Sequence, residues 1–121
     1  MNQIEELKTK IQKLVNQYNF GNYKLVIQEV NILLKKLPNN SFLLNLLGSC
    51  YQKLGDFDTA IKNFLQVLST EQKNLAAMNN LANAYKDTLE FEKAENLYKE
   101  IINIDPNYIN AITNYANLKF Q

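Results

Sequence analysis

The sequence predicts an all-α protein built from repeated pairs of helices, and three observations support this prediction. The 121 residues contain many helix formers but only three Gly and two Pro, the residues that interrupt helices most often. Apolar residues recur at the i, i+3, i+4, i+7 spacing of one helical face. The segment 43–68 is also followed by a similar segment at 76–102, and we call the offset from Leu47 to Leu81 one repeat period. A period of this length is typical of a chain that stacks one supersecondary unit several times.

The repeat preserves residue type as well as spacing. Leu47 corresponds to Leu81, and Gly48 corresponds to Ala82. Further matching pairs are Tyr51 and Tyr85, Phe57 and Phe91, Ala60 and Ala94, Phe64 and Tyr98, and Leu68 and Ile102. A third copy of the second half lies upstream at Gly21, Tyr23, Val26, Val30 and Leu34. We therefore expect repeats at about 8–40, 41–74 and 75–108, followed by the segment 109–121.

The first repeat departs from this spacing in its first helix. Its second helix matches the middle repeat at one repeat period. Its first helix matches only when the shift is one position shorter than that period. The apolar stripe that gives this match is Ile11, Leu14, Val15 and Tyr18. This difference predicts that the turn before Tyr23 is one residue shorter than the other turns. In this alignment Val15 stands where Gly48 stands, so we expect the first two helices to pack less closely.

The middle repeat indicates how the two helices of a unit are joined and packed. Gly55 can take the positive φ that ends a helix, and Asp56 is a good N-cap for the next helix. Asn22 takes the same place in the first repeat. Short helices must bury their apolar stripes against a neighbour. We expect the closest helix contacts at the small residues Gly48, Ala60, Ala82 and Ala94.

The segment 109–121 begins a fourth unit, with Ile112, Tyr115 and Ala116 at the expected places. One interpretation is a capping helix, because repeat arrays need polar ends for solubility. The other is the first helix of a fourth repeat that is truncated after residue 121. The second is favoured, because Ile112, Tyr115 and Phe120 are poor residues for a solvent-facing surface.

These residues resemble the tetratricopeptide repeat family, whose pattern is W-x2-L-G-x2-Y, then A-x3-F, then P within a helix–turn–helix. The middle repeat has Leu47-Gly48-x2-Tyr51 and Ala60-x3-Phe64 but lacks the Pro, and Leu44 takes the place of the Trp. The third repeat has Leu81-Ala82-x2-Tyr85, Ala94-x3-Tyr98 and Pro106, with Met78 in place of the Trp. The resemblance covers nearly the whole chain. It implies one domain, 1–121, folded as a right-handed superhelix (an α-solenoid) whose concave groove is lined by the first helix of each unit.

The resemblance implies which side chains would face that groove. The candidate peptide-binding residues are Asn45, Ser49, Asn79, Asn80, Asn83, Asp87, Asn114 and Asn117. An amide donates and accepts at once, so Asn can pair with the backbone of an extended peptide whatever its side chains. The O-GlcNAc transferase family resembles this arrangement, because its repeat superhelix carries an asparagine ladder. Here Asn80 with Asn114, and Asn83 with Asn117, would be the rungs, although the 19 Asn also fit a general bias toward Lys, Asn and Ile.

The resemblance also indicates a binding mode that this chain lacks. Chaperone-binding members hold the C-terminal carboxylate of a Glu-Glu-Val-Asp tail with Lys, Asn and Arg. Places where those basic groups would be expected hold Ala76, Asn80, Asn110 and Asn114. We therefore expect no carboxylate clamp.

The composition excludes most catalytic chemistry. The chain has no His, no Arg and no Trp, and its single Cys cannot form an internal disulfide or a Cys-based zinc site. We expect neither a catalytic residue, nor a metal ligand, nor a bound cofactor. A net charge of +1 is too small to indicate a nucleic acid or an anionic membrane as partner. Cys50 is interpreted as a buried structural thiol in a cytoplasmic protein.

We therefore predict a non-catalytic scaffold that binds a peptide or protein partner in its concave groove. One alternative is the N-terminal substrate-recruiting module of a larger enzyme, such as a glycosyltransferase or sulfotransferase. Another alternative is self-association through the terminal helix, because the open ends of repeat arrays can stack on one another.

Overall fold

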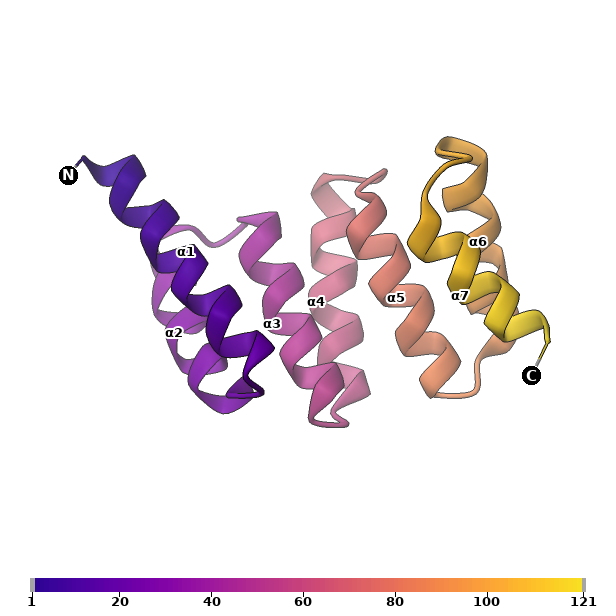
Figure 1. Cartoon of the computed structure of the whole chain (residues 1–121), viewed down its shortest axis with the longest axis horizontal. Coiled ribbons are helices and arrows are strands. Elements are labelled where there is room, and N and C mark those ends of the chain that lie inside the picture. Colours follow the sequence, from indigo (N-terminus) through magenta and orange to yellow (C-terminus); the bar gives the residue numbers. More distant parts are fainter. Residues whose placement is uncertain (1, 121) are drawn as a thin grey trace.

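The computed structural model describes residues 2–120, and within them it contains seven α-helices and no strand. In chain order the helices are α1 (Gln3–Asn19), α2 (Tyr23–Lys36), α3 (Ser41–Lys53), α4 (Phe57–Thr70), α5 (Leu75–Asp87), α6 (Phe91–Ile104) and α7 (Ile109–Lys119). This architecture confirms the all-α solenoid predicted from the sequence. The helices stack along one long axis, with the two ends of the chain at opposite ends of the molecule (Figure 1).

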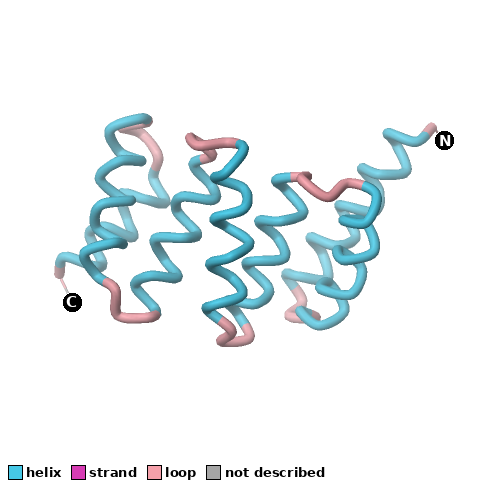
Figure 2. The backbone as a smooth tube through the Cα atoms, turned by 180° about the vertical axis from the view of Figure 1, so that it is seen from behind, coloured by secondary structure: helices cyan, strands magenta, loops and turns pink. Residues whose placement is uncertain are grey.

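The helices form two layers. One layer holds α1, α3, α5 and α7, and the other holds α2, α4 and α6, as views from the two sides show (Figures 1 and 2). We call the first the odd-helix layer. Within it α5 contacts both α3 and α7, while each helix also contacts the next one along the chain. Side chains of successive repeats can therefore meet directly across the odd-helix layer.

Caps at the helix starts account for part of the unusual Asn content. The side chain of Asn40 accepts a hydrogen bond from the backbone N–H of Leu43, at the start of α3. Asn74 does the same at the start of α5, and Asn2 at the start of α1. Each bond satisfies a backbone donor that a helix start otherwise leaves unpaired. These asparagines are therefore explained by local structure.

The caps of α2 and α4 differ, although we expected them to be alike. Asp56 accepts a hydrogen bond from the backbone N–H of Thr59 at 3.2 Å, as predicted. Asn22 makes no such bond at the start of α2. Its side chain instead donates to Oε1 of Gln17, at the end of α1. Asn22 is therefore the N-cap residue of α2, as predicted, but its side chain does not make the capping hydrogen bond that Asp56 makes.

The turn between α1 and α2 has the same length as the turns between α3 and α4 and between α5 and α6. In each, the residue with positive φ donates its N–H to the carbonyl three positions before it, and these residues are Gly21, Gly55 and Leu89. They are spaced one repeat period apart, as are the first residues of α2, α4 and α6. The prediction of a shorter first turn was therefore wrong. The apolar stripe of α1 is displaced by one position, and the turn is not.

This displacement changes how α1 packs on α2. Counted by the repeat period, Leu14 takes the place of Gly48, and Val15 does not. Leu14 is buried in one cluster with Val30, which itself takes the place of Phe64. The first repeat thus pairs a large residue on its first helix with a smaller one on its second, whereas the middle repeat pairs glycine with phenylalanine. Such an exchange keeps the total volume roughly constant.

The core of the later repeats follows one rule, in which a small residue faces an aromatic ring. Phe64 and Tyr98 are the two largest fully buried side chains among the described residues. Phe64 lies against Gly48, and Tyr98 shares a cluster with Ala82. Cys50 is buried as expected, and burial raises the pKa of its thiol to about 11.

Two features are absent from residues 2–120. None of the helices there is both long and apolar enough to cross a membrane. The same residues bring no three metal-binding side chains of the His, Cys, Asp or Glu type together.

Candidate functional site

The eight candidate residues all lie in the odd-helix layer. Asn45 and Ser49 belong to α3, four others belong to α5, and the last two belong to α7. We call this set the polar row; its members on α5 and α7 are Asn79, Asn80, Asn83, Asp87, Asn114 and Asn117. The row crosses three successive helices that contact one another.

One amide pair of the polar row joins α5 to α7. Nδ2 of Asn114 donates a hydrogen bond to Oδ1 of Asn79 at 3.2 Å. Asn79 is only 7% exposed, and it is the one buried polar residue in the described part of the chain. Buried amides require such partners, because leaving a polar group unpaired costs about 1–3 kcal/mol. This pair therefore stabilises the contact between two successive repeats.

The equivalent places on α3 and α5 are held by Asn45 and Asn80, each one repeat period before its counterpart. There the hydrogen bond is not made. Oδ1 of Asn45 is the one buried side-chain oxygen or nitrogen without a hydrogen-bond partner among residues 2–120. Asn80 is half-buried, and its side chain makes no hydrogen bond within these residues. Two asparagines thus form a hydrogen-bonded pair between α5 and α7, whereas the equivalent two asparagines on α3 and α5 leave an acceptor unpaired.

A second polar contact joins α3 to α5 at the end of the row. Nε2 of Gln52 donates to Oδ2 of Asp87 at 3.2 Å. Both partners are exposed or half-exposed, so this hydrogen bond adds little to stability. It does place the carboxylate of Asp87 on α5 beside the amide of Gln52 on α3.

Two members of the row hydrogen-bond to tyrosines. Burial raises the pKa of Tyr18, and a hydrogen bond with Ser49 opposes that rise. The hydroxyl of Tyr98 donates to Oδ1 of Asn83. Burial raises the pKa of Tyr98 to about 12, with a smaller contribution from the negative charge of Asp87. Ser49 and Asn83 therefore have structural partners of their own.

The sequence interpretation missed the bond between Asn83 and Tyr98. A signal was present, because Phe64 of the middle repeat becomes Tyr98 in the third. A hydroxyl added in a buried place needs an acceptor, and a polar side chain on the facing helix supplies one. In the middle repeat Ser49 takes the place of Asn83, and Phe64 has no hydroxyl for it to satisfy.

The polar row pairs its amides at a spacing that the sequence did not indicate. Asn80 with Asn114, and Asn83 with Asn117, were the expected rungs, one repeat period apart. The amide bond across the layer instead joins Asn79 to Asn114, one position further apart. The predicted rungs are equivalent places in successive repeats, and their role as ligand contacts stays a prediction. Asn117 is exposed at the end of the row.

Comparison with known proteins connects this geometry to a family. The sequence pattern described as "Tetratricopeptide repeat" matches residues 40–107, more than half of the chain. No curated protein sequence matches. Among solved structures, the tetratricopeptide repeat domain of Sgt2 from Aspergillus fumigatus superposes with a TM-score of 0.84 at 17% identity, covering 94% of this chain and 77% of that one.

Two other similar structures were solved with bound peptides. The first repeat domain of Spaghetti (RPAP3), bound to the HSP90 peptide SRMEEVD, has a TM-score of 0.83 at 18% identity, covering 92% of this chain and 88% of that one. The type III secretion chaperone SycD of Yersinia enterocolitica, in complex with a peptide of the translocator YopD, has a TM-score of 0.81 at 20% identity, covering 98% and 97%. At such identities the likeness shows a shared fold. The matched residues 40–107 and the stacked helix pairs together show that this chain belongs to the tetratricopeptide repeat family.

Proposed function

We propose that this protein is a scaffold that binds an extended peptide segment of a partner along the polar row. The observation that carries the proposal is the buried, unpaired Oδ1 of Asn45. Rotation of the half-buried Asn45 side chain would bring this acceptor to the surface, where a backbone N–H of a bound peptide would satisfy it and remove its cost. Asn80, on the neighbouring helix, would pair with the next peptide group along the ligand. Asn45 and Asn80 are thus the centre of the proposed site.

The chemistry of the polar row supports a ligand recognised mainly through its backbone. Seven of its eight members are neutral amides or a hydroxyl, and Asp87 is the single charged one. Neutral amides match the alternating donors and acceptors of an extended chain without requiring a charged side chain. The peptides bound to RPAP3 and SycD support a peptide ligand for this shared fold.

The proposal divides the row into two kinds of residue. Asn79, Asn83 and Ser49 already have partners within the protein, so they contribute mainly to the shape of the site. Asn45 and Asn80 have unused hydrogen-bonding capacity, so they contribute most to the affinity. This order differs from that of a uniform asparagine ladder, in which every rung would contribute alike.

The test uses a random peptide library displayed on phage and selected against the folded protein. The affinity of the selected peptide is then measured by isothermal titration calorimetry for several variants. Asn45→Ala and Asn80→Ala should each weaken binding about tenfold, the effect of losing one hydrogen bond in a partly buried site. Asn96→Ala, on the exposed face of α6, is the matched control and should change nothing.

A folded Asn45→Ala variant with unchanged affinity would overturn the assignment, with folding checked by circular dichroism. Selected peptides that still bind after both Asn45 and Asn80 are replaced would place the ligand elsewhere. We propose that the domain contributes no catalytic step, in line with a composition that has no His and no Arg. If it recruits substrates for a larger glycosyltransferase or sulfotransferase, the same row would bind them, and the downstream reading frame distinguishes that case.

A further inference from the structure

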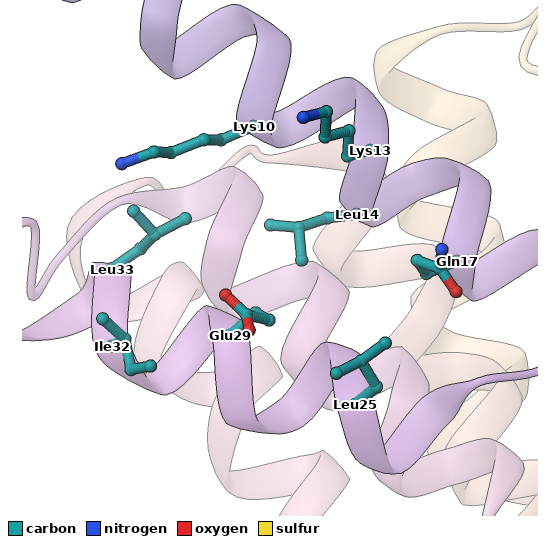
Figure 3. A pocket seen from close by; sticks show the side chains of 8 residues that line it. All are labelled: Lys10, Lys13, Leu14, Gln17, Leu25, Glu29, Ile32 and Leu33. Atoms are coloured by element: carbon teal, nitrogen blue, oxygen red, sulfur yellow. The ribbon is translucent and has the colours of Figure 1, made fainter.

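The seam between α1 and α2 is open along one side. It forms a hollow of about 300 Å³ whose apolar lining comes from Leu14, Leu25, Ile32 and Leu33 (Figure 3). Lys10 and Lys13 project from α1 along one rim of this hollow, and Glu29 of α2 lies between its apolar residues (Figure 3). We call it the seam hollow. It lies at the end of the molecule that carries the N-terminus (Figure 1).

The displaced stripe of α1 explains why this seam is open. Lys10 and Lys13 stand one repeat period before Leu44 and Leu47. Those two leucines are 4% and 6% exposed, and they are buried in the core clusters that join the second repeat to its neighbours. Lysine side chains extend their charged ends into water, so they leave the same space unfilled. The hollow is therefore a specific property of the first repeat.

The second helix of this repeat adds apolar residues where the other repeats are polar. Leu25 is 43% exposed and Ile32 is 57% exposed. The residues equivalent to them are Thr59 and Gln66 in α4, and Lys93 and Glu100 in α6. Exposed apolar residues around a hollow are typical of an interaction surface. Among these equivalent places, only those of the first repeat hold apolar side chains.

The opposite end of the molecule carries a complementary surface. Phe120 is 89% exposed at the end of α7, the highest exposure among the large apolar residues described. The neighbouring Lys119 lines a second hollow together with Phe91 and Glu92, among other residues. Phe91 is itself 45% exposed, and Glu92 makes no ion pair within residues 2–120. The exposed Phe91 thus shares this hollow with the carboxylate of Glu92 and with Lys119, the residue next to Phe120.

We infer that the protein associates head to tail, with Phe120 of one copy entering the seam hollow of a second copy. Apolar surface meets apolar surface in this arrangement, and Glu92 approaches the rim formed by Lys10 and Lys13. The two surfaces lie at opposite ends of one elongated chain, so a chain cannot fill its own hollow (Figure 1). A contact between two different surfaces is heterologous and adds copies one after another. This inference is independent of the polar row.

The first test is multi-angle light scattering of the whole chain over a concentration series. The mean mass should rise with concentration without stopping at a dimer, as expected for a heterologous contact. Ile32→Asp, in the hollow, and Phe120→Asp, at the other end, should each weaken association at least about tenfold, because each removes a central apolar anchor. Leu65→Asp replaces an apolar residue of similar exposure on α4 and should have no effect.

Mixing the two variants separates the possible arrangements. The Phe120→Asp protein keeps an intact hollow and the Ile32→Asp protein keeps an intact Phe120, so together they should form a one-to-one dimer and nothing larger. If Ile32→Asp alone associates like the natural protein, two α7 helices pair with each other and the inference is wrong. If Phe120→Asp alone does so, two hollows pair and the inference is equally wrong. A natural protein that stays monomeric to about 1 mM overturns it as well.

The charged rim has its own test. Lys13→Glu should weaken association roughly two- to fivefold, the effect of one exposed ion pair. In the charge-swapped pair, one copy carries Ile32→Asp and Glu92→Lys and provides the Phe120 end. The other copy carries Phe120→Asp and Lys13→Glu and provides the hollow. Mixing the two should restore the affinity of the one-to-one dimer. If copies that place Glu92 against Lys13→Glu, two like charges, bind as tightly as the charge-swapped pair, the proposed orientation is wrong.

Discussion

A Cβ atom placed on Gly48 would lie 2.5 Å from Cε1 of Phe64, so the ring of Phe64 packs directly against the backbone of α3. Phe64 is fully buried in that position. The first repeat places Leu14 and Val30 at the corresponding sites. The middle repeat therefore has its large side chain on the second helix only, whereas the first repeat has a branched apolar side chain on each helix. The distance between the two facing helices depends on the side chains of both.

Replacing Gly48 by alanine should destabilise the protein by about 1 kcal/mol. The added methyl group overlaps the Phe64 ring, and such overpacking costs about 1–3 kcal/mol. Alanine recovers about 1 kcal/mol through its better helix propensity. Urea unfolding monitored by circular dichroism measures the difference, and a Gly48→Ala protein more stable than the natural one would contradict the close contact.

The double variant Gly48→Ala/Phe64→Leu tests the same contact as a pair. Phe64→Leu alone removes buried contacts and should be destabilising. In the Gly48→Ala background the smaller side chain also relieves the overlap, so the cost of Phe64→Leu should be lower by about 0.5–2 kcal/mol. Additive effects of the two changes would show that the residues do not interact.

Leu89→Gly should stabilise the protein by about 1 kcal/mol. Leu89 has a φ of +65°, at the place where the other two turns have Gly21 and Gly55 at +86° and +84°. This left-handed conformation costs a residue with a Cβ roughly 1–2 kcal/mol, and glycine avoids most of that cost. Leu89 is exposed, so little packing is lost. Gly55→Ala is the reverse control and should destabilise by a similar amount; thermal unfolding compares the two.

Stability should fall at high pH, and Tyr98 should contribute to that fall. Burial raises the pKa of Tyr98 from 10.0 to about 12, so the folded state keeps the phenol proton when the unfolded state has lost it. The stabilisation is complete below pH 10 and is lost as pH rises toward 12. Tyr98→Phe removes this titration, and urea midpoints across that range should therefore decline less steeply. Tyr18 and Tyr108 shift in the same direction, so part of the decline should remain. An identical decline in both proteins would show that Tyr98 is not the group involved.

The HSP90 peptide SRMEEVD, found bound to RPAP3, should bind this protein weakly if at all. A terminal carboxylate is held best by charged donors, and Ala76, Asn80, Asn110 and Asn114 stand where basic groups were expected. Isothermal titration should give a Kd weaker than about 100 μM. Binding in the low micromolar range would show that another set of residues forms a clamp.

Local periodicity made the helix pairs predictable, because helical spacing and turn residues depend on neighbours in the chain. The eight residues of the polar row lie on helices of one layer, as the helix pairs predict, and their role in binding stays a prediction. The hydrogen bonds within the row were not predictable. Asn79 with Asn114 is bonded and Asn45 with Asn80 is not, although the residue types are identical. That difference depends on the position of one helix relative to the next.

The first turn shows the limit of aligning apolar stripes. Its backbone hydrogen bonds keep the register of the other turns, yet the stripe Leu14, Val15 and Tyr18 suggested otherwise. An interior helix such as α3 packs on helices both before and after it, so its buried face is determined by two neighbours. Within residues 2–120, α1 packs only on helices that follow it, so it can bury a stripe that is displaced by one position. The positive φ of Leu89 was not predicted either, because the turn imposes this backbone conformation whatever residue stands there.

The sequence by itself determined the helix pairs, the repeat period, the family and the polar character of one layer, because these depend on residue type and local spacing. Only the tertiary structure decided which amides pair and which acceptor stays unpaired. It alone decided that the seam beneath Lys10 and Lys13 stays open. Those outcomes depend on side-chain volume and helix rotation at each contact, and neighbouring helices determine both.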